Sequence, residues 1–278
     1  MRPIFSASTP REPPPADTAA GRPEQLAEQL RSLGVRESAV LLVHMSYRAV
    51  RPVLGGPPAV IEALRTAIGS EGTLVMPSWG DDDDTPFDPT TTSVTSDLGV
   101  TADIFWRLPE VRRSSHPFAF AAVGPQAATV TADPLPLPPH RLESPIGRVY
   151  QLDGQILLLG VGHEANTTVH LAEVLAQVPY GVPKYCTVME HGRPVRIVYT
   201  ENDHCCERFA LVDEWLRARR LQREGRVGHA HARLLESRDV VTVVYEQLAR
   251  DPLIFLHPVE SGCVECDEAR GTLRTKAY

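Results

Sequence analysis

The sequence lacks the features of a membrane or secreted protein. Its longest apolar runs, such as Val240 to Tyr245, are far too short to cross a bilayer. Its first residues contain no apolar segment of the kind that a secretory signal needs. It has only five cysteines, an odd number, so a framework of disulfides is not expected. Together these absences predict a cytoplasmic protein with reduced thiols.

Basic residues are also fewer than acidic ones. The 278 residues carry a formal net charge of −7, which argues against a nucleic-acid partner and suits a cationic one. The chain has no internal repeats and no glycine-rich fingerprint of the Rossmann or P-loop type. It also lacks the G-x-S-x-G elbow that presents a serine nucleophile. We therefore expect neither nucleic acid nor a membrane as a partner.

What remains is the composition of an ordinary soluble globular protein, with 42% hydrophobic and 23% charged residues. Four prolines between Pro10 and Pro15, among Ser, Thr and Ala, indicate a disordered N-terminal tail over residues 1–22. The remaining residues, 23–278, are long enough for one large or two modest domains with a sizeable core, and a single domain is the expectation.

Strand and helix patterns alternate along this domain, which is the α/β signature. We expect buried strands at residues 39–43, 72–77, 119–123 and 156–159, and a hairpin within residues 186–199. Helices are expected at residues 25–33, 57–68, 101–107 and 125–132, from about 166 onward, and at 209–220 and 240–250. We interpret residues 230–235 as helical and residues 254–257 as a terminal strand.

The stretch from Ile156 to Glu173 carries the first group of chemically active residues. An apolar run breaks at two glycines, and a helix that starts near Asn166 places His170 and Glu173 at i and i+3 on one face. A neutral imidazole beside a carboxylate is suited to general-base catalysis. The alternative is an ordinary strand–loop–helix with capping threonines and one surface histidine.

A second group is acidic. Asp81 to Asp84 follow an expected strand directly, and Glu201 with Asp203 lie in a separate loop. Together these carboxylates could receive a polycationic ligand, with each amine paired to a carboxylate. The alternative is simple solvated surface charge.

The third group contains cysteine. The CxxC motif near the C-terminus and the HCC motif supply more soft ligands than a structural zinc site needs. We predict that four of five residues bind zinc and form part of a C-terminal segment: His204, Cys205, Cys206, Cys263 and Cys266. Free buried thiols are the alternative. A redox CxxC is disfavoured, because this one does not open a helix after an early strand.

Several ordered motifs resemble one known family. They are LLVHMSYRAVRP, GTLVMPSW, RRSSHPFAFAAVGP, LLLGVGHEANTTVHLAE, ENDHCCERFAL, DPLIFLHP and GCVECDEAR, spread from about residue 24 to about residue 270. This pattern resembles the aminoglycoside 3-N-acetyltransferases, and within them the class IV, apramycin-acetylating branch. The resemblance implies the α/β/α layered architecture of antibiotic N-acetyltransferases, which differs from the GNAT fold. It also implies acetyl-CoA as cosubstrate and aminoglycosides as substrates, with antibiotic resistance as the result.

The resemblance also implies roles for individual residues. His170 matches the catalytic base, which deprotonates the 3-amino group of the 2-deoxystreptamine ring for direct attack on the thioester. Glu173 would orient His170, and Thr168 would donate to the developing oxyanion. The matching substrate-binding positions are Asp83, Asp84, His140, Glu201 and Asp203. The matching coenzyme A positions are Ser46, Tyr47, Ser114, Ser115 and Phe118.

The sequence departs from the family pattern in one place. The family has His-Ser-Ser after the first strand, whereas this chain has His44, Met45 and Ser46. One hydroxyl for coenzyme A is therefore missing. The alternatives are an acetyltransferase of the same fold that acts on another amine, and a protein that binds cationic drugs without chemistry. A monomer and a homodimer are both compatible with the sequence.

Overall fold

The computed structural model describes residues 20–115, 118–132 and 137–273. Most of the predicted disordered tail lies outside these residues. Its last three residues, 20–22, are described, and Gly21 forms a parallel bridge with Val53.

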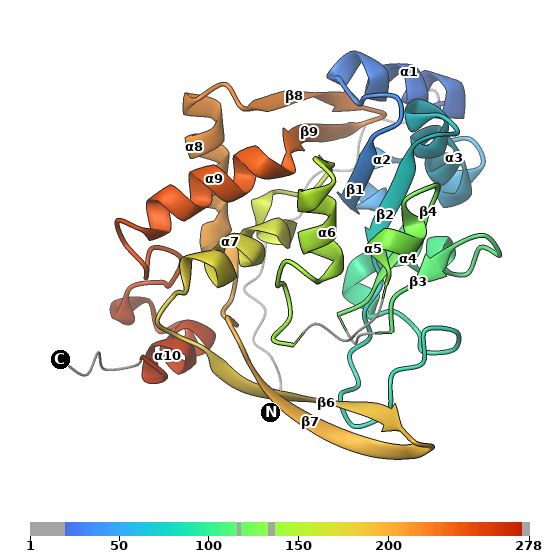
Figure 1. Cartoon of the computed structure of the whole chain (residues 1–278). Helices are drawn as coiled ribbons and strands as arrows, with labels where there is room; N and C mark the ends of the chain where they lie inside the picture. The colour runs from blue at the N-terminus through green and yellow to red at the C-terminus, as the bar shows by residue number, and fades with distance from the viewer. Residues whose placement is uncertain (1–19, 116–117, 133–136, 274–278) are drawn as a thin grey trace.

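A seven-stranded mixed sheet forms the middle layer (Figure 1). Its centre is parallel and consists of β2 (Thr73–Pro77), β1 (Val40–Met45) and β5 (Gln155–Leu159). On one side β4 (Phe120–Val123) pairs antiparallel with β2, and β3 (Arg112–Arg113) follows it. On the other side β9 (Ala230–Glu236) pairs antiparallel with β5, and β8 (Gln222–Val227) forms the edge. The parallel strands are near-continuous apolar runs because both of their faces are covered.

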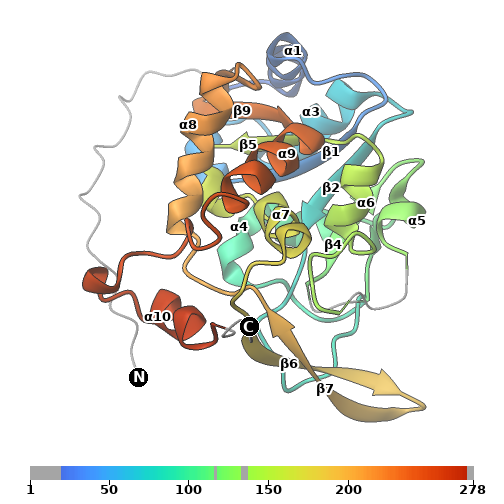
Figure 2. The ribbon, with the colours of Figure 1, turned by 60° about the vertical axis from the view of Figure 1, so that its left-hand side comes forward.

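Helices cover both faces, so the predicted α/β/α layered architecture is confirmed (Figures 1 and 2). One core, built on Leu41, Leu74 and Leu157, lies under α1 (Pro23–Leu33), α2 (Tyr47–Val50), α3 (Gly56–Ile68) and α4 (Gly99–Trp106). The opposite core, built on Leu42 and Ile156, lies under α5 (Ala127–Val130), α6 (Pro145–Gln151), α7 (Thr168–Ala176), α8 (Leu211–Ala218) and α9 (Ser237–Leu248). Neighbouring residues of one strand enter different cores because side chains alternate across a sheet.

The remaining elements lie beyond the carboxyl ends of the parallel strands. A long two-stranded hairpin, β6 (Val182–Glu190) with β7 (Arg193–Glu201), extends away from the main sheet, and α10 (Val264–Gly271) lies close to its base (Figure 2). Four short 3₁₀ turns complete the description: Ser96–Leu98, His163–Ala165, Glu207–Ala210 and Val259–Ser261. Among the described residues, no helix is long and apolar enough to cross a membrane.

Two sequence-based assignments were wrong. Residues 230–235 form strand β9, because Ala230, Ala232 and Leu234 are buried with the period of two that a strand requires. Residues 254–257 lie in turns, and Phe255 is buried against Phe209 at 4.8 Å between ring centroids without joining the sheet. A short apolar run shows that a segment is buried, but it does not show whether the segment pairs with a strand.

Candidate active site

The carboxyl ends of β1 and β5 bring the first polar groups together. Gly160, directly after β5, has φ +73°, and a Cβ there would lie 2.4 Å from the Cβ of Ala49. This turn requires glycine, and it holds the start of α7 close to β1. As a result the Thr167 hydroxyl lies 3.2 Å from Nε2 of His44. Burial lowers the pKa of His44 to about 4, so its imidazole is neutral at pH 7.

The predicted pair of His170 and Glu173 is present on α7. Nδ1 of His170 lies 2.7 Å from Oε2 of Glu173, as the i, i+3 spacing on one helix face requires. The Glu173 carboxylate is fully buried. Its other oxygen accepts a hydrogen bond from the Tyr180 hydroxyl at 2.5 Å and lies 2.9 Å from Nε2 of His204.

These contacts keep Glu173 ionised. Burial by itself raises the pKa of a carboxyl group, but the hydrogen bonds from His170 and His204 outweigh it and lower the pKa of Glu173 to about 2. A permanent carboxylate holds the proton of His170 on Nδ1 and leaves Nε2 to accept another. The Sγ of Cys206 lies 3.5 Å from this Nε2.

Aromatic rings fix the orientation of the His170 imidazole. His140 stacks on it with 4.9 Å between centroids and an interplanar angle of 14°. Phe209 meets it edge-on at 5.0 Å. The prediction placed His140 in the substrate site, and the structure places it in direct contact with the proposed base.

Two cavities meet at His170. The first, of about 240 Å³, is lined by Trp79, Asp83, Phe118, His140, Thr167, His170, Lys184, Tyr199, Glu201 and Asp203. The second, of about 300 Å³, is lined by His44, Met45, Pro77, Trp79, Asp97, Leu98, Val161, Glu164, Ala165, Asn166, Thr167, His170, Cys206 and Phe209. Trp79, Thr167 and His170 line both. A reaction between two bound molecules could take place at this boundary.

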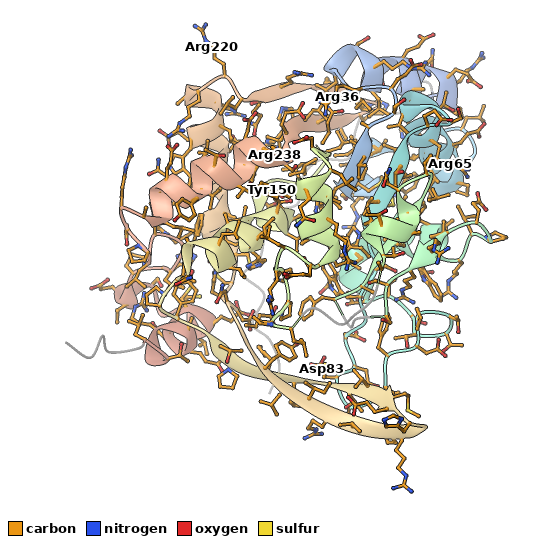
Figure 3. All side chains as sticks on the ribbon, viewed as in Figure 1. Arg36, Arg65, Asp83, Tyr150, Arg220 and Arg238 are labelled. Carbon is orange, nitrogen blue, oxygen red and sulfur yellow. The ribbon has the colours of Figure 1, made fainter. Side chains whose placement is uncertain are left out.

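The first cavity is acidic, as predicted. Asp83, Glu201 and Asp203 line it, and Figure 3 shows Asp83 beside the β6–β7 hairpin. Burial, reinforced by Asp203, raises the pKa of Glu201 to about 8, and burial also raises the pKa of Asp83. Lys184 forms an ion pair with Asp203 at 2.5 Å. These carboxylates were predicted to be grouped, whereas Lys184 carries no sequence signal.

Asp84 lies elsewhere. Its side chain is 70% exposed and pairs with Arg196 at 2.6 Å on the hairpin, and it does not line the acidic cavity. Consecutive residues of an extended loop point in different directions, so one member of the aspartate run enters the cavity and its neighbour does not. The substrate-site prediction for Asp84 has no support in this geometry.

The predicted coenzyme A residues are only partly near the second cavity. Met45 lines it, and Ser46 and Tyr47 follow directly at the start of α2. Phe118 lines the acidic cavity instead. The Ser114 hydroxyl accepts a hydrogen bond from the Phe120 backbone N–H at 3.2 Å, and Ser115 next to it is half-buried without lining either cavity.

The position of Thr168 does not fit its predicted role as an oxyanion donor. The Thr168 hydroxyl is buried without a hydrogen-bond partner among the described residues, and it lines neither cavity. Thr167 lines both cavities. Helix α7 begins close to the expected position, with Thr167 as N-cap and Thr168 as the first helical residue. Successive side chains point about 100° apart around a helix axis, so the two threonines face different surroundings.

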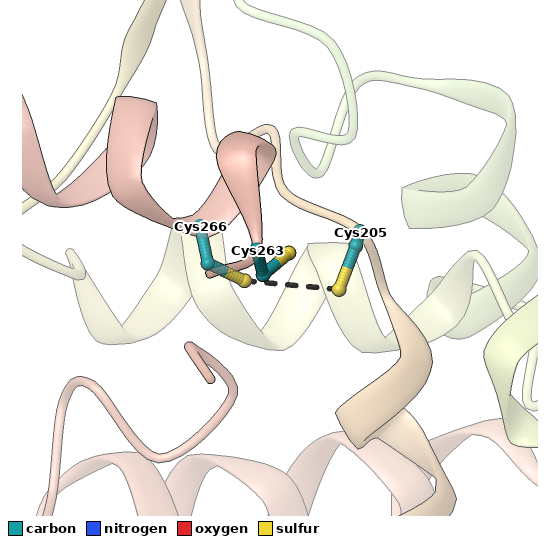
Figure 4. Close-up of side chains that lie close together, drawn as sticks. All are labelled: Cys205, Cys263 and Cys266. Atoms are coloured by element: carbon teal, nitrogen blue, oxygen red, sulfur yellow. Dashed lines mark hydrogen bonds between the residues drawn. The ribbon is translucent and has the colours of Figure 1, made fainter. Parts of the chain in front are cut away.

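The five predicted zinc ligands separate into two groups. The Sγ atoms of Cys205, Cys263 and Cys266 all lie within 4.8 Å of one another, and those of Cys205 and Cys266 are 3.7 Å apart (Figure 4). His204 and Cys206 turn the other way, toward Glu173 and His170. The prediction missed Tyr180, because nothing in its local sequence connects it with Glu173.

Comparison with known proteins gives consistent results. The family model described as aminoglycoside 3-N-acetyltransferase matches residues 42–249. Aminoglycoside N(3)-acetyltransferase IV of Salmonella sp. is 64% identical over 87% of this chain and 92% of its own length. A histidine-to-alanine mutant of aminoglycoside acetyltransferase AAC(3)-IVa has been solved with a gentamicin and with apramycin. These two structures are 61% and 59% identical, cover 93% and 90% of this chain and all of their own, and have TM-scores of 0.91 and 0.85.

Proposed function

This chain belongs to the aminoglycoside 3-N-acetyltransferase family, and we propose that it transfers the acetyl group of acetyl-CoA to the 3-amino group of the 2-deoxystreptamine ring in aminoglycosides such as apramycin and gentamicin. The observation that carries this proposal is the position of His170. It lines both cavities, and a buried carboxylate holds its Nδ1. A base at the boundary can take a proton from a molecule in one cavity while that molecule attacks a second molecule in the other.

The aminoglycoside occupies the acidic cavity. Its ammonium groups pair with Asp83, Glu201 and Asp203, and one of them competes with Lys184 for Asp203. An amine among carboxylates keeps its proton more firmly, because opposite charge favours the charged form. The 3-amino group therefore needs a base before it can attack.

His170 supplies that base. Nε2 accepts the proton of the 3-ammonium group, and the carboxylate of Glu173 stabilises the imidazolium through Nδ1. The free amine attacks the thioester carbonyl directly, and the tetrahedral intermediate collapses with cleavage of the C–S bond. The imidazolium gives its proton to the departing coenzyme A sulfur, and the neutral imidazole then takes the second proton from the nitrogen and passes it to solvent, which leaves the amide and free coenzyme A. Thr167, which lines both cavities, takes the oxyanion role first predicted for Thr168.

Acetyl-CoA occupies the second cavity. A more distant relative in the family, AAC-IIIb, is 25% identical over 84% of this chain, and its solved structure contains CoASH. Met45, Pro77, Leu98, Val161 and Phe209 give this cavity the apolar wall that a thioester arm needs. Ser46, Tyr47, Ser114 and Ser115 remain candidates for contacts with the rest of the cofactor, whereas Phe118 lies on the substrate side.

The direct test is product formation. Purified protein is incubated with acetyl-CoA and, separately, apramycin, gentamicin or a simple diamine, and each product is analysed by mass spectrometry and NMR. We expect one acetyl group on the 3-amino position of the aminoglycosides and none on the simple diamine. Acetylation of the diamine alone would indicate a different substrate class. Binding of apramycin without any acetylated product would indicate a sequestering protein.

A further inference from the structure

The C-terminal helix α10 is weakly anchored by its own residues. It has only eight residues, of which only Cys266 and Ala269 are buried, and Val264 is 79% exposed. Arg270 donates a hydrogen bond to the His257 carbonyl, and Thr272, just after the helix, accepts one from the Gly181 N–H at 2.9 Å. Such a short helix is marginal in water unless other contacts hold it.

The three thiols at this helix have the geometry of a metal site. Tetrahedral zinc binds sulfur at about 2.3 Å, which places two sulfur ligands about 3.8 Å apart. The Sγ atoms of Cys205 and Cys266 are 3.7 Å apart, and Cys263 lies within 4.8 Å of both. Figure 4 shows the three side chains converging from α10 and from the loop after β7. A disulfide would use only two of these thiols.

His257 lies next to the three thiols on the side of Cys205, in a separate group with Cys205 and Glu207. One of its ring nitrogens is within 4.8 Å of the Cys205 Sγ. Its Nε2 is buried without a hydrogen-bond partner among the described residues, and Oε2 of Glu207 is 3.4 Å away. The Glu207 side chain is 78% exposed, so His257 is the better candidate for a fourth ligand.

We propose that Cys205, Cys263, Cys266 and His257 bind one structural zinc ion that fixes α10 to the loop between β7 and the next helix. Three thiolates and one imidazole are a ligand set that zinc prefers, with all four positions closed. The site draws its ligands from three separate segments of the chain, at residues 205, 257 and 263–266. Zinc therefore performs the anchoring that the few buried side chains of α10 do not.

The position of Cys205 connects this site with the catalytic cluster. Its neighbours in sequence are His204, which lies 2.9 Å from Oε1 of Glu173, and Cys206, whose Sγ lies 3.5 Å from Nε2 of His170. Fixing Cys205 on zinc fixes the backbone between two residues that touch the catalytic pair.

The first test is metal content. Protein purified without a metal-affinity tag is analysed for zinc by mass spectrometry, together with the Cys263→Ser/Cys266→Ser double variant and Cys186→Ser. Cys186 is a buried thiol on β6 outside the cluster and serves as the matched control. We expect one zinc per chain in the wild type and in Cys186→Ser, and none in the double variant. A folded wild type that contains no zinc, whether its thiols are free or Cys205 and Cys266 form a disulfide, would overturn the proposal.

The second test identifies the fourth ligand. The apoprotein is titrated with Co²⁺, whose visible spectrum reports tetrahedral thiolate coordination, and zinc affinity is measured by competition with a chromophoric chelator. His257→Ala is expected to weaken zinc binding by more than about 10-fold, the lower end of what even an outer-shell partner contributes. Glu207→Ala should bind like the wild type. Equal affinity in His257→Ala, or loss of binding in Glu207→Ala, would overturn the assignment of His257.

Discussion

The two cavities that meet at His170 have opposite characters. The first has three carboxylates, Asp83, Glu201 and Asp203, on loops and on the base of the hairpin. The second is lined largely by apolar side chains such as Met45, Leu98 and Val161, near the ends of the parallel strands. The first suits a polycation and the second suits a thioester arm. The two substrates thus bind in separate cavities, whereas the proton transfer depends on His170, which lines both.

If that division is correct, replacing His170 lowers turnover strongly while both cavities still bind their substrates. We expect His170→Ala to lower kcat by about 10²–10⁴-fold, the contribution of a general base. The KM values for aminoglycoside and acetyl-CoA should change little, because the carboxylates and the apolar wall remain. Steady-state kinetics with both substrates check this, and a kcat near that of the wild type would exclude His170 as the base.

The Glu173→Gln variant removes the carboxylate that orients the imidazole of His170 and leaves the imidazole itself in place. An amide in place of the carboxylate no longer fixes the proton on Nδ1 of His170, and we expect kcat to fall by about 10²-fold, the lower end of a base's contribution. The buried hydrogen bonds with Tyr180 and His204 are also disturbed, at a cost of about 1–3 kcal/mol in stability. Thermal melting distinguishes this loss of stability from the loss in kcat. An unchanged kcat would show that Glu173 is only structural.

The Asp203→Asn variant tests the acidic cavity and leaves the second cavity unchanged. Losing a charge-assisted hydrogen bond of about 1.5–3 kcal/mol should raise the KM for aminoglycoside by about 10- to 100-fold. The KM for acetyl-CoA should not change. Asp84→Asn is the matched control, because its carboxylate is exposed and pairs with Arg196 outside the cavity. Equal effects of the two substitutions would mean that the total negative charge of this part of the molecule matters, and not the position of Asp203 in the cavity.

The Leu98→Trp variant tests the second, apolar cavity and leaves the acidic cavity unchanged. A larger ring narrows the second cavity, which Leu98 lines, and an overpacking cost of about 1–2 kcal/mol corresponds to an increase of about 10-fold in the KM for acetyl-CoA. The KM for aminoglycoside should stay constant. The opposite pattern would assign the two substrates to the other cavities.

The smallest expected effect is a dependence of aminoglycoside affinity on pH. Burial, and then Asp203, raise the pKa of Glu201 to about 8, so below pH 8 the free protein holds a proton there. A cationic ligand favours the ionised carboxylate, so binding releases this proton and affinity rises with pH until about 8. Between pH 7 and 8 the ionised fraction grows about fivefold, and the affinity contributed by Glu201 grows with it. Calorimetry in buffers of different ionisation enthalpy measures the proton release, which Glu201→Gln should abolish.

Sequence patterns predicted most of the sheet and the central pair of the site. The apolar runs at β1, β2 and β5 and the i, i+3 spacing of His170 and Glu173 are local features, so one segment suffices to predict them. Strand β9 was mistaken for a helix because its short apolar run fits both structures until its pairing with β5 is known. Tyr180 and Lys184 have no local signal, because their roles depend on residues distant in the chain.

Three neighbouring residues show that the local sequence does not determine which side chains come into contact. The motif His204-Cys205-Cys206 showed that soft, polar side chains gather at one point of the chain. The local sequence made all three candidates for one zinc site, which was expected to take four ligands from these residues and the two cysteines of the CxxC motif. Tertiary structure divided them, because successive residues of an irregular loop point in different directions and each meets a different partner. His204 and Cys206 face Glu173 and His170, and Cys205 faces the thiols of α10. The amino-acid order specified which chemical groups are present and the family to which they belong, whereas packing specified which of them can touch.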